Sequence, residues 1–477
     1  MIFIIIAVIV VAFIAIVLIR TAMFRPYEAV APDTSELTVD GDRAVSHLQR
    51  MIRIKTVSNR DDSLVDWSKF EEFRNALGEM YPAVSAKCTV ELIGKSGVLY
   101  TLKGKSSKEP SVFMAHYDVV PANEEAWSKP AFDAIIEDGV MWGRGTLDTK
   151  TTLLGVMEAA EDLIRDGFVP ENDMYFAFSG DEEIMGTSAG SIVAELEKRG
   201  VVPALVLDEG GAVVEDVFPG VHGRCALVGT GEKGLMDLDM IIDGAGGHAS
   251  APPPHTSVGR LAKAVSAIED HPFKAKLSKP AAGMYDTLGR HSTFAYRMIF
   301  ANQWCFFQLL NSMCKKKGGE MNAMMRTTCA FTMMDGSLAH NVLPPHARIG
   351  ANLRLAEGDT TESAVAYLKK LANDDGIEFK VAYGMDPQRS SDTSCESWKK
   401  VQSAIAGTWK GCLVSPYLMV ACSDSRHYCR ITDKVYRFSA MELSTEERRL
   451  IHGNDERITL EKISSAVEFY KRIMKMY

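Results

Sequence analysis

Residues 111–121 read SVFMAHYDVVP, and the first five of them predict a short, fully buried strand. His116 and Asp118 follow directly after this strand. Two more apolar runs, 174–178 (MYFAF) and 204–207 (ALVL), are also followed closely by acidic residues. In open α/β sheets, ligands bind outside the carboxyl ends of the strands. The sequence therefore predicts an α/β domain with a site at one edge of its sheet.

Helical patterns lie between these predicted strands. Residues 150–166 (KTTLLGVMEAAEDLIRD) space their apolar side chains three and four positions apart. Residues 188–199 (SAGSIVAELEKR) predict a second helix that ends at Gly200. Buried strands that alternate with helices are typical of a mainly parallel sheet that is covered on both faces.

A different pattern begins near residue 230. Residues 235–242 (LMDLDMII) alternate polar and apolar side chains, as a strand with one solvated face does. Five further elements fit the same unit: helices at 256–269 and 360–373, and strands at 327–334, 347–355 and 378–383. We therefore expect a smaller α+β domain at 230–387.

The α/β pattern resumes after this insertion. Apolar runs lie near 413–420 and 435–439, and a final helix is predicted at 459–476. The catalytic domain is therefore expected in two parts, 41–229 and 388–477.

The predicted strand ends gather one imidazole and many carboxylates at the same edge of the sheet. These side chains are His116, Asp118, Asp181, Glu182, Glu183, Asp208 and Glu209. Such a cluster repels itself unless protons or metal cations neutralise it. Imidazole and carboxylate ligands without a thiolate suit zinc, or another divalent metal, in a hydrolytic site.

The order of the motifs along the chain resembles the dizinc aminoacylase/carboxypeptidase family. The matching motifs are 116–121 (HYDVVP), Trp127, 138–139 (DG), 143–145 (GRG), Asp148 with Lys150, 179–183 (SGDEE), 208–210 (DEG), 246–248 (GGH) and His452. The resemblance extends from about residue 42 to 477, and 452–457 (HGNDER) is most similar to the carboxypeptidase S and N-acyl-amino-acid hydrolase branch. It implies a zinc-peptidase-like catalytic domain that is interrupted by a smaller lid and dimerisation domain.

This resemblance implies two Zn²⁺ ions per subunit, with Co²⁺ or Mn²⁺ as alternative metals. Asp148 would bridge the two ions. His116 and Asp208 would complete the ligands of one ion, and Glu183 and His452 those of the other. Two metals about 3.5–4 Å apart can activate a water molecule and polarise the scissile carbonyl together.

Two further carboxylates are implied to act beside the metals. Asp118, two residues beyond His116, would orient that imidazole and raise its basicity. Glu182 would be the general base that takes a proton from the metal-activated water and passes it to the leaving nitrogen.

The smaller domain is implied to complete the site. His248 matches a histidine that reaches the active site of a partner subunit and steadies the oxyanion. Asn341 and Arg354 match positions that hold a substrate carboxylate, a task that suits a planar guanidinium. The resemblance thus implies a homodimer that forms through the lid domain.

Together these residues predict a dizinc metallohydrolase of carboxypeptidase or aminoacylase type, which cleaves a peptide or N-acyl-amino-acid bond adjacent to a free carboxylate. Two alternatives stay open: a serine hydrolase that uses Ser188 in 186–190 (GTSAG), and a non-catalytic binding protein on the same fold. A serine elbow turns directly from strand to helix, whereas three acidic residues intervene between 178 and 186 here. The complete metal and base set disfavours the binding protein.

Charge and composition exclude several classes of protein. Lys and Arg number 53 against 62 Asp and Glu, and the resulting net charge of −9 gives no basic field for nucleic acid. Hydrophobic residues make up 46% of the chain, which excludes a disordered protein. The nine cysteines form no C-x-x-C pair, so a zinc ribbon has no support.

The N-terminal residues 1–19 (MIFIIIAVIVVAFIAIVLI) carry no charge. Their length is close to the lower limit for a helix that crosses a bilayer of about 30 Å. No basic residue precedes Arg20 and no A-x-A cleavage site is evident, so we expect a single-pass anchor at 1–25 rather than a signal peptide or a buried helix. A polar linker at 26–40 follows. Arg20 and Arg25 favour a cytoplasmic body, whereas the carboxypeptidase S resemblance favours a lumenal or external one.

Overall fold

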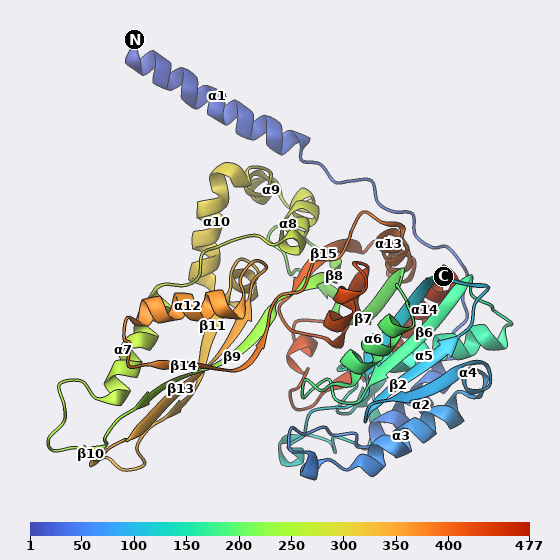
Figure 1. The fold of residues 1–477 in the computed structure, drawn as a ribbon. Helices are drawn as coiled ribbons and strands as arrows, with labels where there is room; N and C mark the ends of the chain where they lie inside the picture. The colour runs from blue at the N-terminus through green and yellow to red at the C-terminus, as the bar shows by residue number, and fades with distance from the viewer.

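Eight strands build the main sheet, in the order β1-β2-β6-β3-β7-β16-β8-β15 (Figure 1). The computed structural model describes residues 1–477 without a gap. The strands are β1 (Thr89–Ile93), β2 (Gly97–Leu102), β3 (Ser106–His116), β6 (Asn172–Ser179), β7 (Leu205–Glu215), β8 (Arg224–Glu232), β15 (Leu413–Met419) and β16 (Val435–Glu442). Each strand predicted for this domain is present.

The main sheet is mixed in direction. β3 runs parallel to β6 and β7, β16 to β7, and β15 to β8. The pairs β1–β2, β2–β6, β7–β8 and β16–β8 are antiparallel. The expected parallel arrangement therefore holds for the central strands but not for the sheet as a whole. The cause is local, because β1 joins β2 through residues 94–96 alone, and a connection this short permits only antiparallel pairing.

Both faces of the central strands are buried, as their continuous apolar runs require. Phe113 of β3 belongs to the larger core, whereas its neighbours Val112 and Met114 belong to a smaller core on the other face. The helices of the larger core include α2 (Gly41–Arg53), α3 (Trp67–Met80), α4 (Pro82–Lys87), α5 (Lys150–Arg165), α13 (Glu396–Thr408) and α14 (Leu460–Lys475). The smaller core lies under α6 (Ser188–Lys198).

A three-stranded sheet in the order β17-β5-β4 joins distant parts of the chain. Its strands are β4 (Ile135–Glu137), β5 (Val140–Trp142) and β17 (Arg457–Thr459). All its pairs are antiparallel. This small sheet brings the loop that contains His452 next to the loop that contains Asp148.

The inserted domain has its own antiparallel sheet, in the order β11-β13-β9-β14. Its elements are β9 (Gly234–Asp243), β11 (Thr328–Asp335), β13 (His346–Leu355), β14 (Glu378–Met385), α7 (Ser257–Asp270) and α12 (Thr361–Ala372). Alternate side chains of β9, from Met236 to Ile242, form a separate core with both helices. The predicted half-solvated strand is thus confirmed. Figure 1 shows β10 (Gly247–His248), which pairs with β12 (Val342–Leu343), at the end of this domain away from the catalytic domain.

Four helices fall within the predicted insertion but share the core of the catalytic domain. They are α8 (Lys279–His291), α9 (Phe294–Ala301), α10 (Gln303–Lys317) and α11 (Gly319–Ala323). Tyr285, Leu288 and Phe300 belong to the larger core, and α8 packs on the edge strand β15. The insertion therefore forms the lid sheet and also closes one edge of the main sheet.

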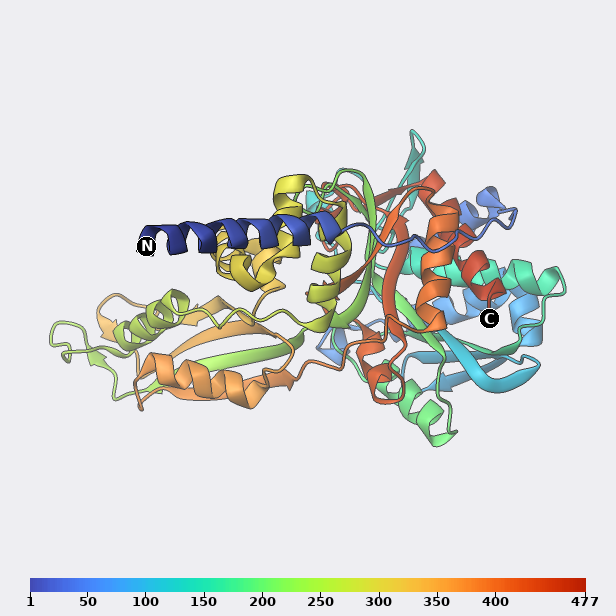
Figure 2. The same ribbon diagram turned by 90° about the horizontal axis from the view of Figure 1, so that it is seen from above.

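Helix α1 (Ile2–Met23) extends away from the catalytic domain with nearly all its side chains exposed (Figures 1 and 2). It is the one helix long and apolar enough to cross a membrane, with a mean hydropathy of 3.8, and an N-terminal signal sequence would share these properties. The segment after it, 24–40, has no regular structure. Asp33 ties this segment to the catalytic domain through an ion pair of 2.8 Å with Arg472.

Candidate active site

Three neighbouring strands, β6, β3 and β7, bring acidic and imidazole groups to one edge of the main sheet. His116 is the last residue of β3, Asp208 lies in β7, and Glu182 and Glu183 lie in the turn after β6. Asp148 comes from the loop before α5. β3 runs parallel to both β6 and β7, and its pairing with β7 stops at Leu207, so Asp208 lies beside the carboxyl ends of β3 and β6. The side chains therefore lie at the edge of the sheet that the sequence predicts.

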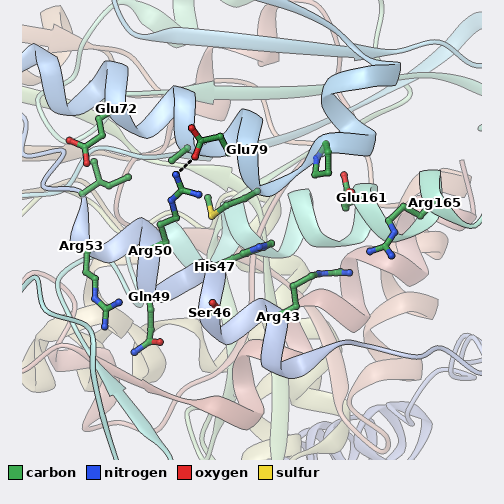
Figure 3. A pocket seen from close by; sticks show the side chains of 14 residues that line it. Arg43, Ser46, His47, Gln49, Arg50, Arg53, Glu72, Glu79, Glu161 and Arg165 are labelled. Atoms are coloured by element: carbon green, nitrogen blue, oxygen red, sulfur yellow. Dashed lines mark hydrogen bonds and ion pairs between the residues drawn. The ribbon is translucent and has the colours of Figure 1, made fainter.

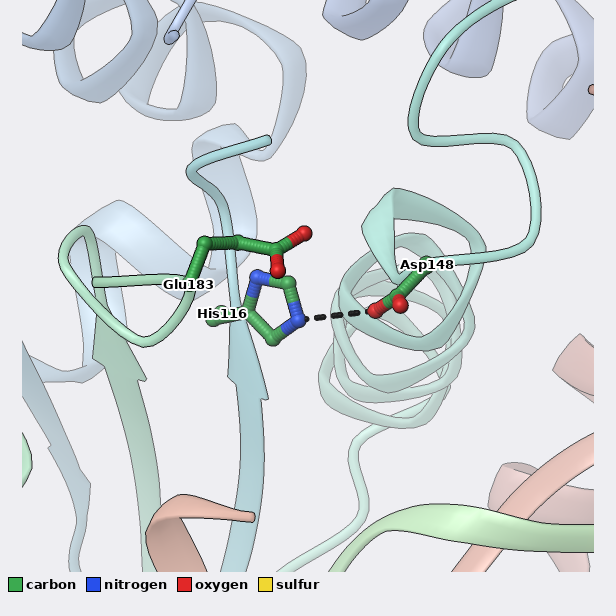
Figure 4. Close-up of side chains that lie close together, drawn as sticks. All are labelled: His116, Asp148 and Glu183. Atoms are coloured by element: carbon green, nitrogen blue, oxygen red, sulfur yellow. Dashed lines mark hydrogen bonds and ion pairs between the residues drawn. The ribbon is translucent and has the colours of Figure 1, made fainter. Parts of the chain in front are cut away.

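Four of the five predicted metal ligands are in direct contact. His116 Nε2 lies 3.0 Å from Asp148 Oδ1. His452 Nε2 lies 3.0 Å from Asp148 Oδ2 and 3.0 Å from Glu183 Oε2. Figure 4 shows His116 and Asp148 pointing toward each other, with the Glu183 carboxylate beside the imidazole. Asp148 thus presents its two oxygens to two different histidines, an arrangement suited to a carboxylate shared by two cations.

Asp208, the fifth predicted ligand, is buried within the adjacent strand β7. Its Oδ2 accepts a hydrogen bond of 2.9 Å from the backbone N–H of Ser425. Burial raises the pKa of Asp208, although the charge of His116 opposes this shift. Asp208 therefore lies near the cluster without a hydrogen bond to the other four predicted ligands.

Asp118 positions both the imidazole and the acidic turn. The Nδ1 of His116 lies 3.0 Å from the main-chain carbonyl of Asp118 and 3.4 Å from its carboxylate. The same carboxylate accepts hydrogen bonds of 3.1 Å from the backbone N–H groups of Glu182 and Glu183. With Nδ1 engaged in this way, Nε2 of His116 faces Asp148. Asp118 therefore orients more of the site than the single imidazole that the sequence assigns to it.

The two histidines of the cluster favour the protonated form in the metal-free protein. Burial lowers the pKa of His116, but its hydrogen bonds with Asp118 and Asp148 raise that pKa well above the ordinary value overall. Hydrogen bonds with Asp148 and Glu183 raise the pKa of His452 to about 10. These imidazoles must lose their protons before they can bind a metal.

Burial favours the protonated form of several carboxyl groups in the cluster. Burial raises the pKa of Glu182, Glu183 and Glu209 above their ordinary values. Burial also raises the pKa of Asp424 to about 7, with the charge of Arg426 opposing the shift. So many buried carboxyl groups can ionise together only if cations compensate their charge.

The donor atoms fit a divalent metal. Glu183 Oε1 is buried and has no hydrogen-bond partner, although Oε2 of the same carboxylate pairs with His452. A buried carboxylate oxygen without a partner is costly unless a cation binds it. Ligand atoms of His116, Asp148 and Glu183 all lie within 4.8 Å of one another. Imidazole nitrogen and carboxylate oxygen are ligands that zinc accepts.

A buried ion pair that the sequence does not reveal links the two ligand loops. Glu456 accepts hydrogen bonds from Arg144 Nη1 (2.7 Å) and from the backbone N–H of Leu147 (2.6 Å). Arg144 in turn donates to the carbonyl oxygens of His452 and Gly453. Both charged residues lie in motifs quoted above, 143–145 and 452–457, but their spacing along the chain gives no sign that they pair.

A second group missed from the sequence follows β15. Arg426 Nη1 lies 4.0 Å from Glu182 Oε1, and Arg426 Nη2 lies 3.6 Å from Asp424 Oδ1. Both residues belong to a short helix, Asp424–Arg430, and both are buried. The rule that strand ends carry functional side chains could have found them, because 413–420 is one of the predicted strands.

The cluster opens into a cavity of about 720 Å³. Its wall includes Asp148, Glu182, Glu183 and His452, and the lid domain adds Arg354 from β13. The Arg354 guanidinium lies 3.3 Å from Cys422 Sγ and forms no ion pair with an acidic side chain. It is therefore free to bind an anionic group in the cavity.

His248 and Asn341, the other residues predicted from the lid, lie elsewhere. His248 forms the short strand β10, is exposed, and has its Nδ1 2.7 Å from Ser250 Oγ. The backbone carbonyl of Asn341 accepts a hydrogen bond from the backbone N–H of Ala249, next to it. The structure thus brings His248 and Asn341 together at the lid tip, and neither lines the cavity that contains Arg354.

Ser188, the alternative nucleophile, has no imidazole beside it. Its hydroxyl bonds to Asp181 Oδ2 at 2.9 Å and lies 2.9 Å from Ser96 Oγ. The side chain is buried at the start of α6. A serine nucleophile needs an adjacent general base such as histidine, so this arrangement suits a structural residue that begins the helix rather than a catalytic serine.

A second cavity of similar size, about 690 Å³, lies between α2, α3 and α5 (Figure 3). Figure 3 shows Arg50 and Glu79 pointing toward one another, and they form an ion pair. Arg43 likewise pairs with Glu158 and Asp162. Because none of the predicted site residues lines it, this cavity does not compete as the active site.

Comparison with protein families gives a long match. The profile of peptidase family M20/M25/M40 matches residues 112–476. Probable carboxypeptidase S-like 2 of Dictyostelium discoideum is 32% identical over 458 residues, which cover 94% of this chain and 88% of that protein. N-fatty-acyl-amino acid synthase/hydrolase PM20D1 of Xenopus tropicalis is 34% identical over 437 residues, which cover 90% of this chain and 85% of that protein.

Solved structures agree on the fold. The M20 family metallo-carboxypeptidase Sso-CP2 from Sulfolobus solfataricus superposes with a TM-score of 0.67 at 17% sequence identity, covering 90% of this chain and 99% of that one. The di-peptidase Dug1p from Saccharomyces cerevisiae gives a TM-score of 0.64 at 16% identity, covering 91% and 96%. At these identities the likeness extends to the fold alone.

Proposed function

The chain belongs to peptidase family M20/M25/M40 and is a zinc-dependent hydrolase, and on that premise we propose that it is a dizinc enzyme with Glu182 as general base. The bond cleaved is a peptide or N-acyl-amino-acid amide next to a free carboxylate. The observation that carries this proposal is the contact of Asp148 with both His116 and His452. A carboxylate between two imidazoles supports a bridging role between two metal ions.

The five proposed ligands are His116, Asp148, Glu183, Asp208 and His452. Bound zinc would supply Lewis acidity, which polarises the scissile carbonyl and makes water acidic near neutral pH. Zinc is the proposed native metal, with Co²⁺ or Mn²⁺ as substitutes of similar ligand preference.

Glu182 supplies the proton transfers in this proposal. Its carboxylate takes one proton from the attacking water, the water oxygen bonds to the carbonyl carbon, and the carbon–nitrogen bond breaks as the proton passes to the leaving nitrogen. Burial raises the pKa of Glu182, which brings the base closer to the working pH. Asp118 holds the backbone of Glu182 in place and also orients His116.

The substrate is proposed to lie in the cavity beside the cluster, with its carboxylate on Arg354. Arg354 has no acidic partner, and a guanidinium can bind a carboxylate through two parallel hydrogen bonds. A small, largely apolar pocket shares Glu320, Tyr417 and Arg448 with the cavity, and Met284 is among its apolar lining residues. This neighbour favours an apolar acyl group or side chain on the other part of the substrate.

A homodimer is proposed to complete the site through the lid domain at 230–387, which interrupts the catalytic parts at 41–229 and 388–477. His248 and Asn341 are exposed at the lid tip and lie outside the cavity of their own chain. A partner's cavity is the place where His248 could donate to the oxyanion and Asn341 could help to bind the substrate.

The N-terminal segment at 1–25 is proposed as a single-pass membrane anchor, with 26–40 as the tether. The exposed apolar surface of α1 supports this assignment. The body of the enzyme would lie on the cytoplasmic side if Arg20 and Arg25 decide the orientation, and on the other side if it follows the carboxypeptidase S pattern.

Removal and restoration of the metal test the proposed function. We expect exhaustive chelation of the full-length enzyme to abolish hydrolysis of N-acyl amino acids or dipeptides, and two equivalents of Zn²⁺ to restore it. Substrates with an amidated carboxylate should react much more slowly, because Arg354 then has no anion to bind. Activity that survives chelation would contradict the proposal. A fluorophosphonate probe that labels Ser188 would instead support the serine hydrolase.

A further inference from the structure

We propose that the α9–α10 hairpin is a second membrane-contacting surface, which holds the lid side of the enzyme against a phospholipid bilayer. The hairpin patch is defined by the exposed side chains of Phe294, Tyr296, Trp304, Leu309 and Met313. Phe294 and Trp304 are each more than half exposed, at 55% and 57%. Exposed aromatic and long apolar side chains of this kind mark interaction sites, and Trp and Tyr favour the level of the lipid headgroups.

The hairpin is attached to the apolar helix α1. Asn302, at the turn between α9 and α10, is fully buried and donates to the carbonyl of Val17 (3.2 Å) and to the hydroxyl of Thr21 (3.1 Å). The rings of Trp304 and Phe13 meet edge to face at 5.7 Å. In both views α1 lies beside these helices on one side of the molecule (Figures 1 and 2).

This attachment fixes the depth of the patch. Phe13 lies ten residues before Met23, the end of α1, which corresponds to about 15 Å along a helix. A side chain that packs on Phe13 must enter the bilayer when this part of α1 enters it. The inference therefore rests on the proposed insertion of α1 for the position of the bilayer, but not on the proposed chemistry of the active site.

The charge around the patch favours a bilayer with anionic headgroups. Residues 287–319 contain five Lys and Arg and no Asp or Glu, within a chain whose net charge is −9. Three of the five, Lys315, Lys316 and Lys317, form the last turn of α10 and are exposed. Residues 1–27 likewise contain two Arg and no acidic side chain. The two segments that pack together are thus both cationic, and clustered Lys and Arg beside an apolar helix are attracted to anionic lipids.

A second copy of the chain is the main rival occupant. A dimer contact through the patch would cover the same aromatic groups, but it would place the cationic segments of two chains against each other. Like charges that face each other disfavour such an interface. The polar side chains Gln308 and Ser312, which lie between the apolar ones on α10, also suit the headgroup level better than a dry interface.

Photo-crosslinking of the full-length protein in phosphatidylcholine–phosphatidylserine vesicles tests this inference. A benzophenone amino acid is placed singly at Leu309 or Met313, at Phe3 of α1 as the probe of insertion, and at Leu338 of the lid as an exposed apolar control. We expect lipid adducts from Leu309, Met313 and Phe3 and none from Leu338. Adducts from Phe3 alone overturn the inference, as do adducts that join two protein chains through the hairpin. If Phe3 gives no lipid adduct, adducts from Leu309 and Met313 still support the inference, and their absence still overturns it.

A charge variant tests the headgroup preference independently. Substituting Gln for Lys315, Lys316 and Lys317 together should reduce the ratio of adduct yield from Leu309 in anionic vesicles to that in phosphatidylcholine vesicles, by up to about fivefold per lysine removed. An unchanged ratio would contradict attraction to anionic headgroups. Hydrolytic activity is measured on the same samples. Neither the adduct yield nor its lipid dependence requires an active enzyme, so failure of this inference can be told apart from failure of the proposed function.

Discussion

The metal-ligand cluster and the lid tip are built in opposite ways. In the cluster, Asp148 and Glu183 are largely buried and contact His116 or His452, and buried hydrogen bonds to Glu456 join the loop of Asp148 to the loop of His452. At the tip, His248 is exposed on a two-residue strand, and its side chain bonds only to neighbouring Ser250. The difference teaches that one chain brings four of the proposed metal ligands into contact by itself, whereas the side chain of His248 at its lid tip faces no part of the cavity in the same chain.

The largest expected effect lies in the cluster. We expect Glu182→Gln to lower kcat by about 10²- to 10⁴-fold, because the amide cannot accept a proton from water. Bound zinc, measured by atomic emission, and the melting temperature should stay near the wild-type values, since glutamine has the same shape. A variant that keeps most of its turnover would contradict the role of general base.

The next largest effect would come from the tip. We expect His248→Ala to lower kcat by about 10²- to 10³-fold through loss of a hydrogen-bond donor to the oxyanion. Because the side chain is exposed, zinc content and melting temperature should not change. His255→Ala, also exposed on the lid, serves as the matched control and should retain full activity.

Mixed dimers show whether the two regions meet across subunits. Heterodimers of His248→Ala and Glu182→Gln chains contain one site with both intact residues if His248 acts in the partner's site, so partial recovery is expected. Purified heterodimers that stay inactive would place the action of His248 within its own chain, against the present geometry.

A smaller effect is expected from the ion pair that supports the cluster. Glu456→Gln removes the charged partner of Arg144 and weakens the hydrogen bonds to the loop of Asp148. We expect zinc affinity to fall by about 10- to 100-fold and the free energy of unfolding by about 1–3 kcal/mol. Chelator competition and urea unfolding measure the two changes. Asp455→Asn, on the same loop but only partly buried and bonded to Ser128 rather than to the loop of Asp148, should change both quantities far less.

The sequence predicts most of the fold because hydrophobic periodicity reports local burial directly. The apolar runs at 111–115, 174–178 and 204–207 all become central strands. Strand direction at the flanks is not encoded in the same way, since it depends on connection length and on which strand finds which neighbour. The packing of α8 on β15 depends on tertiary contacts, so 279–323 looks like part of the lid although it shares the larger core.

The candidate site shows the same difference between features that follow from local sequence patterns and features that depend on tertiary contacts. Residues that directly follow the apolar runs of central strands, such as His116 and Asp208, are visible in the sequence because parallel pairing of these strands brings such positions together. Glu456 was missed because its partner Arg144 lies 312 residues away in the sequence, whereas Arg426 follows the predicted strand at 413–420 and was within reach of the strand-end rule. Asn341 and Arg354 are close in the sequence, but β13 carries them to different ends of the lid, which spacing alone does not reveal.

The smallest expected effect separates the two regions by their pH dependence. In the metal-free protein, protonated His452 pairs with Asp148 and Glu183, and its pKa rises from 6.5 to about 10. This pairing stabilises the fold fully below pH 6.5, and its contribution is lost as the pH rises through about 10. His452 is 51% exposed, so solvent screens the interaction and we expect a decrease of only a few degrees in melting temperature.

Thermal unfolding of chelated wild type and of His452→Gln between these pH values measures this decrease as the difference between the two curves of melting temperature against pH. His248→Gln should keep the wild-type curve, because the lid tip has no acidic cluster beside it, and the zinc-loaded enzyme should show no such difference, because a ligand imidazole is already neutral. Equal slopes of melting temperature against pH for wild type and His452→Gln would show that His452 does not pair with these carboxylates in solution. The cluster would then differ from the lid tip only when metal is bound.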